Sequence, residues 1–92
     1  MKYPKEYLDE IKTRLKVSTI VSKTVRLKKR GKEFVGLSPF KTEKTPSFTV
    51  NDDKEFYHCF ATSEHGNIFD FILKTQNLKF GEAVKSLANL AG

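Results

Sequence analysis

The chain has 92 residues, of which 38% are hydrophobic and 30% charged, and eight Phe and three Tyr supply bulky apolar side chains. This length and composition indicate one folded domain over residues 1–92 and argue against a disordered chain. Seventeen Lys and Arg against eleven Asp and Glu give a net charge of +6. That charge favours a polyanionic partner, with nucleic acid ahead of an acidic protein face or an anionic membrane.

No apolar stretch approaches the length of about 20 residues needed to cross a bilayer, and the N-terminus lacks the apolar segment of a signal peptide. The only cysteine, Cys59, leaves no partner for an internal disulfide and suits a reducing compartment. We therefore expect a cytoplasmic protein that does not bind membranes.

The first expected element is an amphipathic helix over about residues 4–15. Pro4 suits its first turn, and apolar side chains recur at helical spacing at Tyr7, Leu8, Ile11 and Leu15. The next segment, VSTIVSKTV at residues 17–25, is rich in β-branched residues and fits two structures. Ser18 could cap a short helix, or the run could be a strand; we favour a short helix that leads into a strand over residues 25–28.

The middle of the chain reads as two hairpins. KKRGK at residues 28–32 has the glycine of a hairpin turn among cations, and EFVGLS continues in extended form. PSFTV and KEFYHCF form a second pair around residues 51–53, whose Asn and Asp side chains favour a turn. We expect an antiparallel sheet of about four to five strands.

Two helices are expected to follow the sheet. Asn67 can cap a helix with a broad apolar surface, and a second helix begins near Phe80, with Val84 and Leu87 on one face. The order of helix, sheet and helix pair predicts an α+β fold. Because the sequence stops just after the last helix, we expect it to be part of a longer chain.

Two short turns have the outline of a zinc ribbon without its ligands. Structural zinc takes four Cys or His ligands, and here the first turn offers Ser38 and Lys41 while the second offers Cys59 and Thr62. An ammonium repels a dication and hydroxyls replace thiolates poorly. His58 adjoins Cys59 in a predicted strand and should face the opposite way. We expect no zinc and no other cofactor, although residual binding through Cys59 with His58 or His65 stays open.

The chain resembles the N-terminal zinc-ribbon (CHC2-type) domain of bacterial DnaG-type DNA primases. KRGKEFVGLSPFKTEKTPSFTVNDDKEFYHCF, then HGNIFDFI and FGEAVKSLA, is similar to the family pattern of Cys-Pro-Phe-His, Glu-Lys-Thr-Pro-Ser-Phe and Tyr-His-Cys-Phe-Gly-Cys. By this resemblance Ser38, Lys41 and Thr62 replace ligands, and only Cys59 is kept.

We expect another interaction to hold these turns in place of the metal. The hypothesis is a polar cluster of Ser38, Cys59 and Thr62, with the Lys41 ammonium near the former metal position and Glu64 as a possible counter-charge.

A surface for single-stranded DNA needs cations that follow phosphates and rings on which bases stack. The resemblance implies that template-facing residues lie in the family motifs, and the first hairpin adds Lys28 and Lys29. In KEFYHCF, residues 56, 58 and 60 share one face and residues 57 and 59 the other. The hairpin cations could also be merely solvated, and most of the Phe could be core. The predicted DNA-binding residues are Lys28, Lys29, Arg30, Lys44, Lys54, Tyr57 and His58.

We find no catalytic constellation in the sequence. Primer synthesis needs clustered carboxylates that hold Mg²⁺, and the adjacent pair Asp52 and Asp53 reads as a turn. Cys59 beside His58 is a poor nucleophile pair, because neighbouring strand residues point apart.

By resemblance, the full enzyme would continue into a Mg²⁺-dependent RNA polymerase domain and a helicase-binding domain, in a nucleoid-associated protein. This module would hold single-stranded DNA, help to select the initiation site and regulate primer length, acting on the polymerase domain in cis or in trans. The alternative is a protein-interaction module that docks on the helicase or the polymerase domain without binding DNA.

Overall fold

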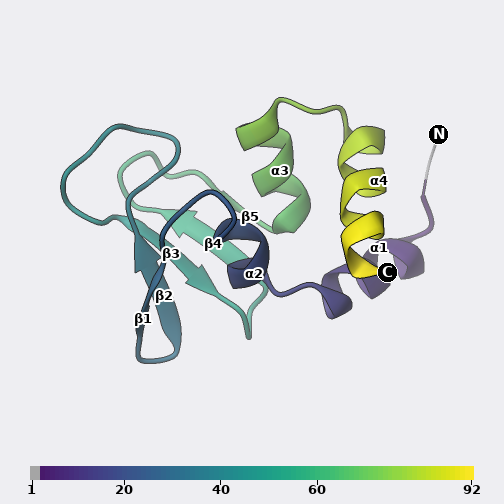
Figure 1. Ribbon diagram of the computed structural model, residues 1–92, viewed down its shortest axis with the longest axis horizontal. Helices are drawn as coiled ribbons and strands as arrows, with labels where there is room; N and C mark the ends of the chain where they lie inside the picture. Colours follow the sequence, from purple (N-terminus) through teal and green to yellow (C-terminus); the bar gives the residue numbers. More distant parts are fainter. Residues whose placement is uncertain (1–2) are drawn as a thin grey trace.

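The computed structural model describes residues 3–92, in which two helices, five strands and two further helices follow one another in the predicted order (Figure 1). The elements are α1 (Lys5–Arg14), α2 (Val17–Val21), β1 (Lys28–Arg30), β2 (Glu33–Gly36), β3 (Phe48–Asn51), β4 (Phe56–Cys59), β5 (His65–Gly66), α3 (Ile68–Gln76) and α4 (Phe80–Ala91).

The five strands form one antiparallel sheet in the order β1-β2-β3-β4-β5, so each strand pairs with the next along the chain. Gly31 turns the chain between β1 and β2 with a left-handed φ of 63°. Between β3 and β4 the side chain of Asn51 accepts a hydrogen bond from the Lys54 N–H at 2.9 Å, which closes the turn predicted there. The predicted α+β class and antiparallel sheet are confirmed.

The segment over residues 17–25 is confirmed as a short helix, but the following strand starts later than predicted. The Val25 N–H donates to the Val21 carbonyl at 2.9 Å, so Val25 extends the helical turn. Its side chain is buried in the core, and β1 begins only at Lys28. The β-branched Val25 is thus buried from a helical turn, although its residue type suggested a strand.

All four helices lie on one side of the sheet or beyond its end. Helix α2 packs on β3, α3 packs on β5 and α2, and α4 joins α3 to α1. Figure 1 shows the sheet at the left and α3, α4 and α1 at the right, which gives a molecule of 40 × 26 × 19 Å. The opposite side of the sheet carries no helix among residues 3–92, so it is open to solvent.

The core runs from the sheet through α2 and α3 to α1 and α4, and its aromatic part lies between the sheet and α3. Phe48 and Tyr57 stack with their ring centroids 5.5 Å apart, and Phe71 of α3 meets Tyr57 edge-on at 5.5 Å. Phe40, from the loop after β2, reaches the same cluster and stacks on Tyr57 at 6.0 Å. The aromatic cluster thus fastens that loop to the sheet.

Helix α3 begins at the predicted cap. The Asn67 side chain accepts hydrogen bonds from the N–H groups of Phe69 and Asp70, and the Asp70 carboxylate accepts one from the Asn67 N–H at 2.9 Å. This capping box fixes the direction of α3 relative to β5. None of the helices within residues 3–92 combines the length and apolar character that a membrane crossing requires.

Candidate nucleic-acid interface and degenerate zinc knuckle

A single row of side chains crosses the sheet on the side that carries no helix. Cross-strand pairing places Lys28 opposite Val35, then Thr49, His58 and finally His65. Because directly paired residues project to the same side, the row lies on this side of all five strands, with Lys28 and His65 exposed and the three residues between them half-buried. We call the surface around it the open face, and its residues used below are Lys28, Arg30, Val35, Thr49, His58, Phe60 and His65. Glu33, which pairs with Arg30, lies on the same side.

One end of the open face is aromatic. Phe60, just after β4, leaves 69% of its surface exposed, and its ring centroid lies 4.4 Å from that of His58. The His58 ring stacks on the His65 ring with centroids 6.0 Å apart and planes 22° apart. The Phe60 ring is tilted by 60° from the His58 ring, so the three rings are neighbours without being coplanar. We call these three rings, at β4 and β5, the aromatic platform.

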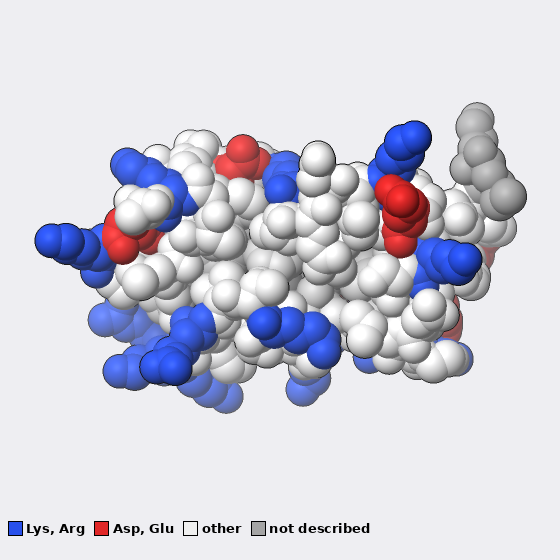
Figure 2. Space-filling view, turned by 45° about the horizontal axis from the view of Figure 1, so that its top comes forward, with Lys and Arg blue, Asp and Glu red and all other residues white. Residues whose placement is uncertain are grey.

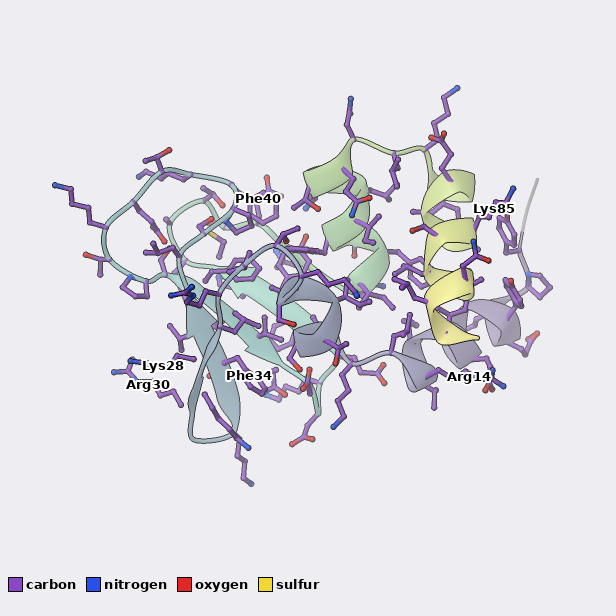
Figure 3. All side chains as sticks on the ribbon, in the orientation of Figure 1. Arg14, Lys28, Arg30, Phe34, Phe40 and Lys85 are labelled. Atoms are coloured by element: carbon purple, nitrogen blue, oxygen red, sulfur yellow. The ribbon has the colours of Figure 1, made fainter. Side chains whose placement is uncertain are left out.

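The other end of the open face is cationic. Lys28 and Arg30 are exposed and point away from β1, whereas Phe34 points toward α2 (Figure 3). Lys and Arg side chains gather over this end of the sheet, at the lower left of Figure 2. A hollow of about 400 Å³ opens beside β1, where cations border an apolar floor. It is lined by Lys28, Lys29, Arg30, Val35, Thr45 and Pro46.

The predicted DNA-binding residues do not all share this surface. Lys28, Arg30 and His58 lie on the open face. Lys29 alternates to the other side, where its ammonium lies 6.0 Å from the centre of the Phe34 ring. Lys44 is exposed on the loop after β2 and Lys54 is exposed in the turn before β4, so both lie at the margins of the sheet.

The prediction that Tyr57 contacts DNA is wrong for this fold, because Tyr57 is 0% exposed. The residue pairs with Val50 on the core side, one position out of phase with His58. Burial raises the pKa of the Tyr57 phenol, and the nearby positive charge of Lys74 opposes that rise. The ring serves the core, and a base has no access to it.

Phe60 and His65 were not among the predicted interface residues. The alternation in KEFYHCF already placed Phe60 beside His58, but a Phe in a small domain is more often buried. His65 belongs to a strand of two residues, too short to be recognised from its sequence. Pairing of His65 with His58 depends on the turn between β4 and β5, which local pattern does not specify.

The predicted polar cluster at the former ligand positions is present only in part. The Cys59 thiol donates to the Ser38 hydroxyl at 3.1 Å, and both side chains are buried. Thr62 is exposed, and its hydroxyl accepts a hydrogen bond from the Glu64 N–H at 3.3 Å. Burial raises the pKa of the Cys59 thiol, but hydrogen bonding with Ser38 and then with Thr62 outweighs it and leaves the pKa below its ordinary value, so Thr62 lies beside the thiol although its side chain is exposed.

The expected roles of Lys41 and Glu64 are wrong. Lys41 is exposed, so its ammonium does not enter the buried cluster. Glu64 instead forms an ion pair with Lys74 at 2.5 Å, and that pair raises the pKa of Lys74. A solvated ammonium has no need of a counter-charge in the interior.

The polar contacts of the first turn are made by Glu43 and not by Lys41. Its carboxylate accepts hydrogen bonds from the Ser38 N–H at 2.9 Å, the Ser47 N–H at 3.2 Å and the Ser47 hydroxyl at 2.8 Å. These bonds, led by the one from Ser38, hold the pKa of Glu43 below its ordinary value, and the charge of Lys41 adds to the effect. Glu43 and Ser47 lie in the Glu-Lys-Thr-Pro-Ser-Phe motif, but their contacts span a loop without regular structure, so the motif alone does not predict them.

The side chains at the former ligand positions do not fit zinc. They comprise one thiol, two hydroxyls and an exposed ammonium, whereas structural zinc takes thiolates and imidazoles. No group of three His, Cys, Asp or Glu within residues 3–92 is arranged to hold a metal. His58 faces the open side of β4 and Cys59 the core side, so these two do not converge.

Comparison with known proteins places this fold among primases. The DNA primase of Staphylococcus epidermidis is 45% identical over 95% of the chain, and that of Escherichia coli K12 is 44% identical over 92%. The chain spans only 14% and 15% of the lengths of these relatives. A crystal structure of Aquifex aeolicus primase, containing its zinc-binding and RNA polymerase domains, matches 94% of the chain and 21% of its own length, with a TM-score of 0.87 at 27% identity. The pattern of the CHC2 zinc finger of DnaG primases matches residues 3–92, and the chain therefore belongs to that family.

Proposed function

We propose that this chain is the template-binding part of a DNA primase that synthesises RNA primers for DNA replication. Single-stranded DNA lies across the open face, and the domain helps to choose the initiation site. It acts with the primase polymerase domain, in cis or in trans, and with the replicative helicase through the full-length protein. The polymerase domain, which lies outside this sequence, supplies the carboxylates that hold catalytic Mg²⁺.

The observation that carries this proposal is the row from Lys28 to His65. It joins a cationic hairpin to an aromatic platform on one solvent-facing side of a rigid sheet. Adjacent strands lie about 4.8 Å apart, so the row spans about 19 Å, a length that accommodates several nucleotides. Cations that follow the backbone and rings that stack on bases are the two components of sequence-tolerant single-strand binding.

The aromatic contact is assigned to Phe60, with His58 and His65 beside it. Phe60 has the exposure that Tyr57 lacks, and its neighbours hold its ring from one side. Phosphates then reach Lys28 and Arg30, whose side chains carry no ion pair with an acidic residue within residues 3–92. Neutralisation of phosphates releases counterions, so affinity should fall steeply with salt.

The cationic half is tested with Lys28→Gln/Arg30→Gln and a labelled single-stranded oligonucleotide, followed by fluorescence anisotropy at several salt concentrations. Loss of two phosphate contacts should weaken binding and reduce the slope of log affinity against log salt by about 1.4. The matched control is Lys5→Gln/Lys85→Gln, which removes the same charge from the exposed surfaces of α1 and α4. Equal slopes for the two variants would refute a specific cationic contact on β1.

The aromatic half is tested with Phe60→Ala. Stacking of one base contributes about 1–3 kcal/mol, so we expect a loss of affinity of about 5- to 150-fold. Leu90→Ala truncates another exposed apolar side chain, at 47% exposure on α4, and should leave binding unchanged. If neither Phe60→Ala nor the β1 variant changes DNA binding, docking on the helicase or the polymerase domain becomes the better function.

A further inference from the structure

The first of the two turns is closed by an acidic side chain. We call residues 37–47 the first knuckle and residues 59–64 the second knuckle. Glu43 bonds to Ser38 at one end of the first knuckle and to Ser47 at the other. A single carboxylate thus spans the loop and satisfies two backbone N–H groups and a hydroxyl.

The second knuckle is closed by its own backbone. The Cys59 N–H donates to the Glu64 carbonyl at 2.7 Å, and the Ser63 N–H donates to the Cys59 carbonyl at 2.7 Å. Ser63 adopts a left-handed φ of 66°, which lets the chain reverse within this short turn. No side chain has to gather the two ends.

The two knuckles are joined at Ser38 and Ser47. The Cys59 thiol donates to the Ser38 hydroxyl, which also accepts the Phe40 N–H at 3.0 Å. The Phe60 N–H donates to the Ser47 carbonyl at 2.9 Å. The Cys59–Ser38 contact thus joins two positions that hold metal ligands in a zinc ribbon, and the Phe60–Ser47 backbone bond supports it from outside those positions.

From these contacts we propose that the domain folds without zinc. Glu43, which belongs to the family motif, closes the first knuckle, and the Ser38–Cys59 hydrogen bond, made at two former ligand positions, joins the two knuckles in place of the metal. The chain is a metal-independent member of a family named for its zinc finger. Its fold is then insensitive to chelators. This inference does not depend on the DNA-binding proposal, since each can fail while the other holds.

The direct test is the metal content of the purified chain. Cells are grown with added zinc, the protein is analysed by elemental mass spectrometry, and its thermal unfolding is followed with and without a strong chelator. We expect zinc far below one atom per chain and the same melting temperature in both samples. One zinc per chain, or a melting temperature that falls with chelator, would overturn the proposal.

The role of Glu43 is tested separately by amide hydrogen exchange of the intact chain. We expect the Ser38 and Ser47 amides to be protected in the wild-type protein and to lose that protection in Glu43→Ala, which removes the oxygen that accepts both bonds, with a lower melting temperature. Glu55→Ala makes the same truncation in an exposed turn and should change neither quantity. Rapid exchange of both amides in the wild type, or retained protection in Glu43→Ala, would show that Glu43 does not close the knuckle.

Discussion

The Tyr57 hydroxyl is a buried oxygen without a hydrogen-bond partner among residues 3–92. The ammonium of Lys74 bonds to Glu64 and lies near enough to the phenol to oppose the rise of its pKa, but it makes no hydrogen bond of acceptable geometry to the Tyr57 hydroxyl. An unsatisfied buried hydroxyl carries a desolvation cost of about 1–3 kcal/mol, whereas the ring itself is well packed.

Tyr57→Phe should therefore stabilise the domain, by about 1 kcal/mol, because it removes the unpaired hydroxyl and keeps the ring. For a chain of this size that corresponds to a rise in melting temperature of about 4–8 °C. Thermal unfolding followed by circular dichroism measures the change, and DNA affinity should stay as in the wild type. A clear loss of stability would mean that the hydroxyl has a partner after all.

Tyr57 and Lys74 also determine how stability changes at alkaline pH. The folded pKa of Tyr57 is raised by burial, so the unfolded chain ionises this phenol first and the fold loses stability as pH rises past about 10. The folded pKa of Lys74 is raised by its hydrogen bond to Glu64, so this stabilisation too is present below about pH 10.4 and lost above it. The two effects have the same sign.

We expect the melting temperature to fall between about pH 9 and 11, and to fall less steeply in Tyr57→Phe, which has no phenol to ionise. Lys74 is partly exposed, so its share is small. Parallel melting curves for wild type and Tyr57→Phe over this range would contradict the assignment to Tyr57.

At the scale of elements, Gly66 joins β5 to the capping box of α3. A Cβ atom at Gly66 would lie 2.5 Å from the Asp70 Cβ, and the residue has a φ of 155°. Gly66→Ala should displace Asp70, weaken the cap and cost about 1–3 kcal/mol in the free energy of unfolding. Denaturant unfolding monitored by circular dichroism gives the value.

Gly81 offers the matched control for that change. A Cβ atom there would meet only the Tyr3 hydroxyl, at the ordinary contact distance of 3.8 Å, in the first turn of α4. Gly81→Ala should therefore stabilise the domain, by about 0.4–1 kcal/mol. The same chemical change thus has opposite signs at two positions, and equal effects would argue against the close approach at Gly66.

The elements that the sequence predicts well are those fixed by neighbours along the chain. Apolar spacing located α1 and α4, Asn67 marked the start of α3, and Gly31 marked the first hairpin. The strand predicted from Val25 was wrong because a β-branched side chain can be buried from a helical turn as well as from a strand. The alternation of side chains in β4 was predicted correctly. Which side of the strand faces the core depends on α2 and α3, and this determines that Tyr57 is buried and Phe60 exposed.

At the scale of the whole molecule, the knuckle contacts join loops whose relation depends on the sheet between them. Residue types at Ser38, Lys41 and Thr62 were enough to argue against zinc, since that argument needs only chemistry. The contacts that hold the two knuckles could not be predicted from the sequence. Glu43 reaches Ser38 and Ser47 across an irregular loop, and Cys59 comes from another strand. The folded sheet, rather than local propensity, brings Cys59 and Ser38 within hydrogen-bonding distance.

This arrangement predicts that a zinc site can be rebuilt. Ser38→Cys, Lys41→His and Thr62→Cys together would give, with Cys59, three thiolates and one imidazole, a set that structural zinc accepts. We expect the triple variant to take up one zinc per chain and to melt at a higher temperature with zinc than with chelator, because the metal binds the folded state alone.

Adding Cys59→Ser to the triple variant removes one ligand and should abolish both effects, which separates a rebuilt site from loose binding to surface thiols. Elemental mass spectrometry and thermal unfolding provide the two measurements. If the triple variant binds no zinc, the two knuckles lie too far apart for tetrahedral coordination. The hydrogen bonds then hold them in a geometry that differs from that of a zinc site. Uptake would instead show that the frame of the metal site persists in a chain whose own side chains hold it closed.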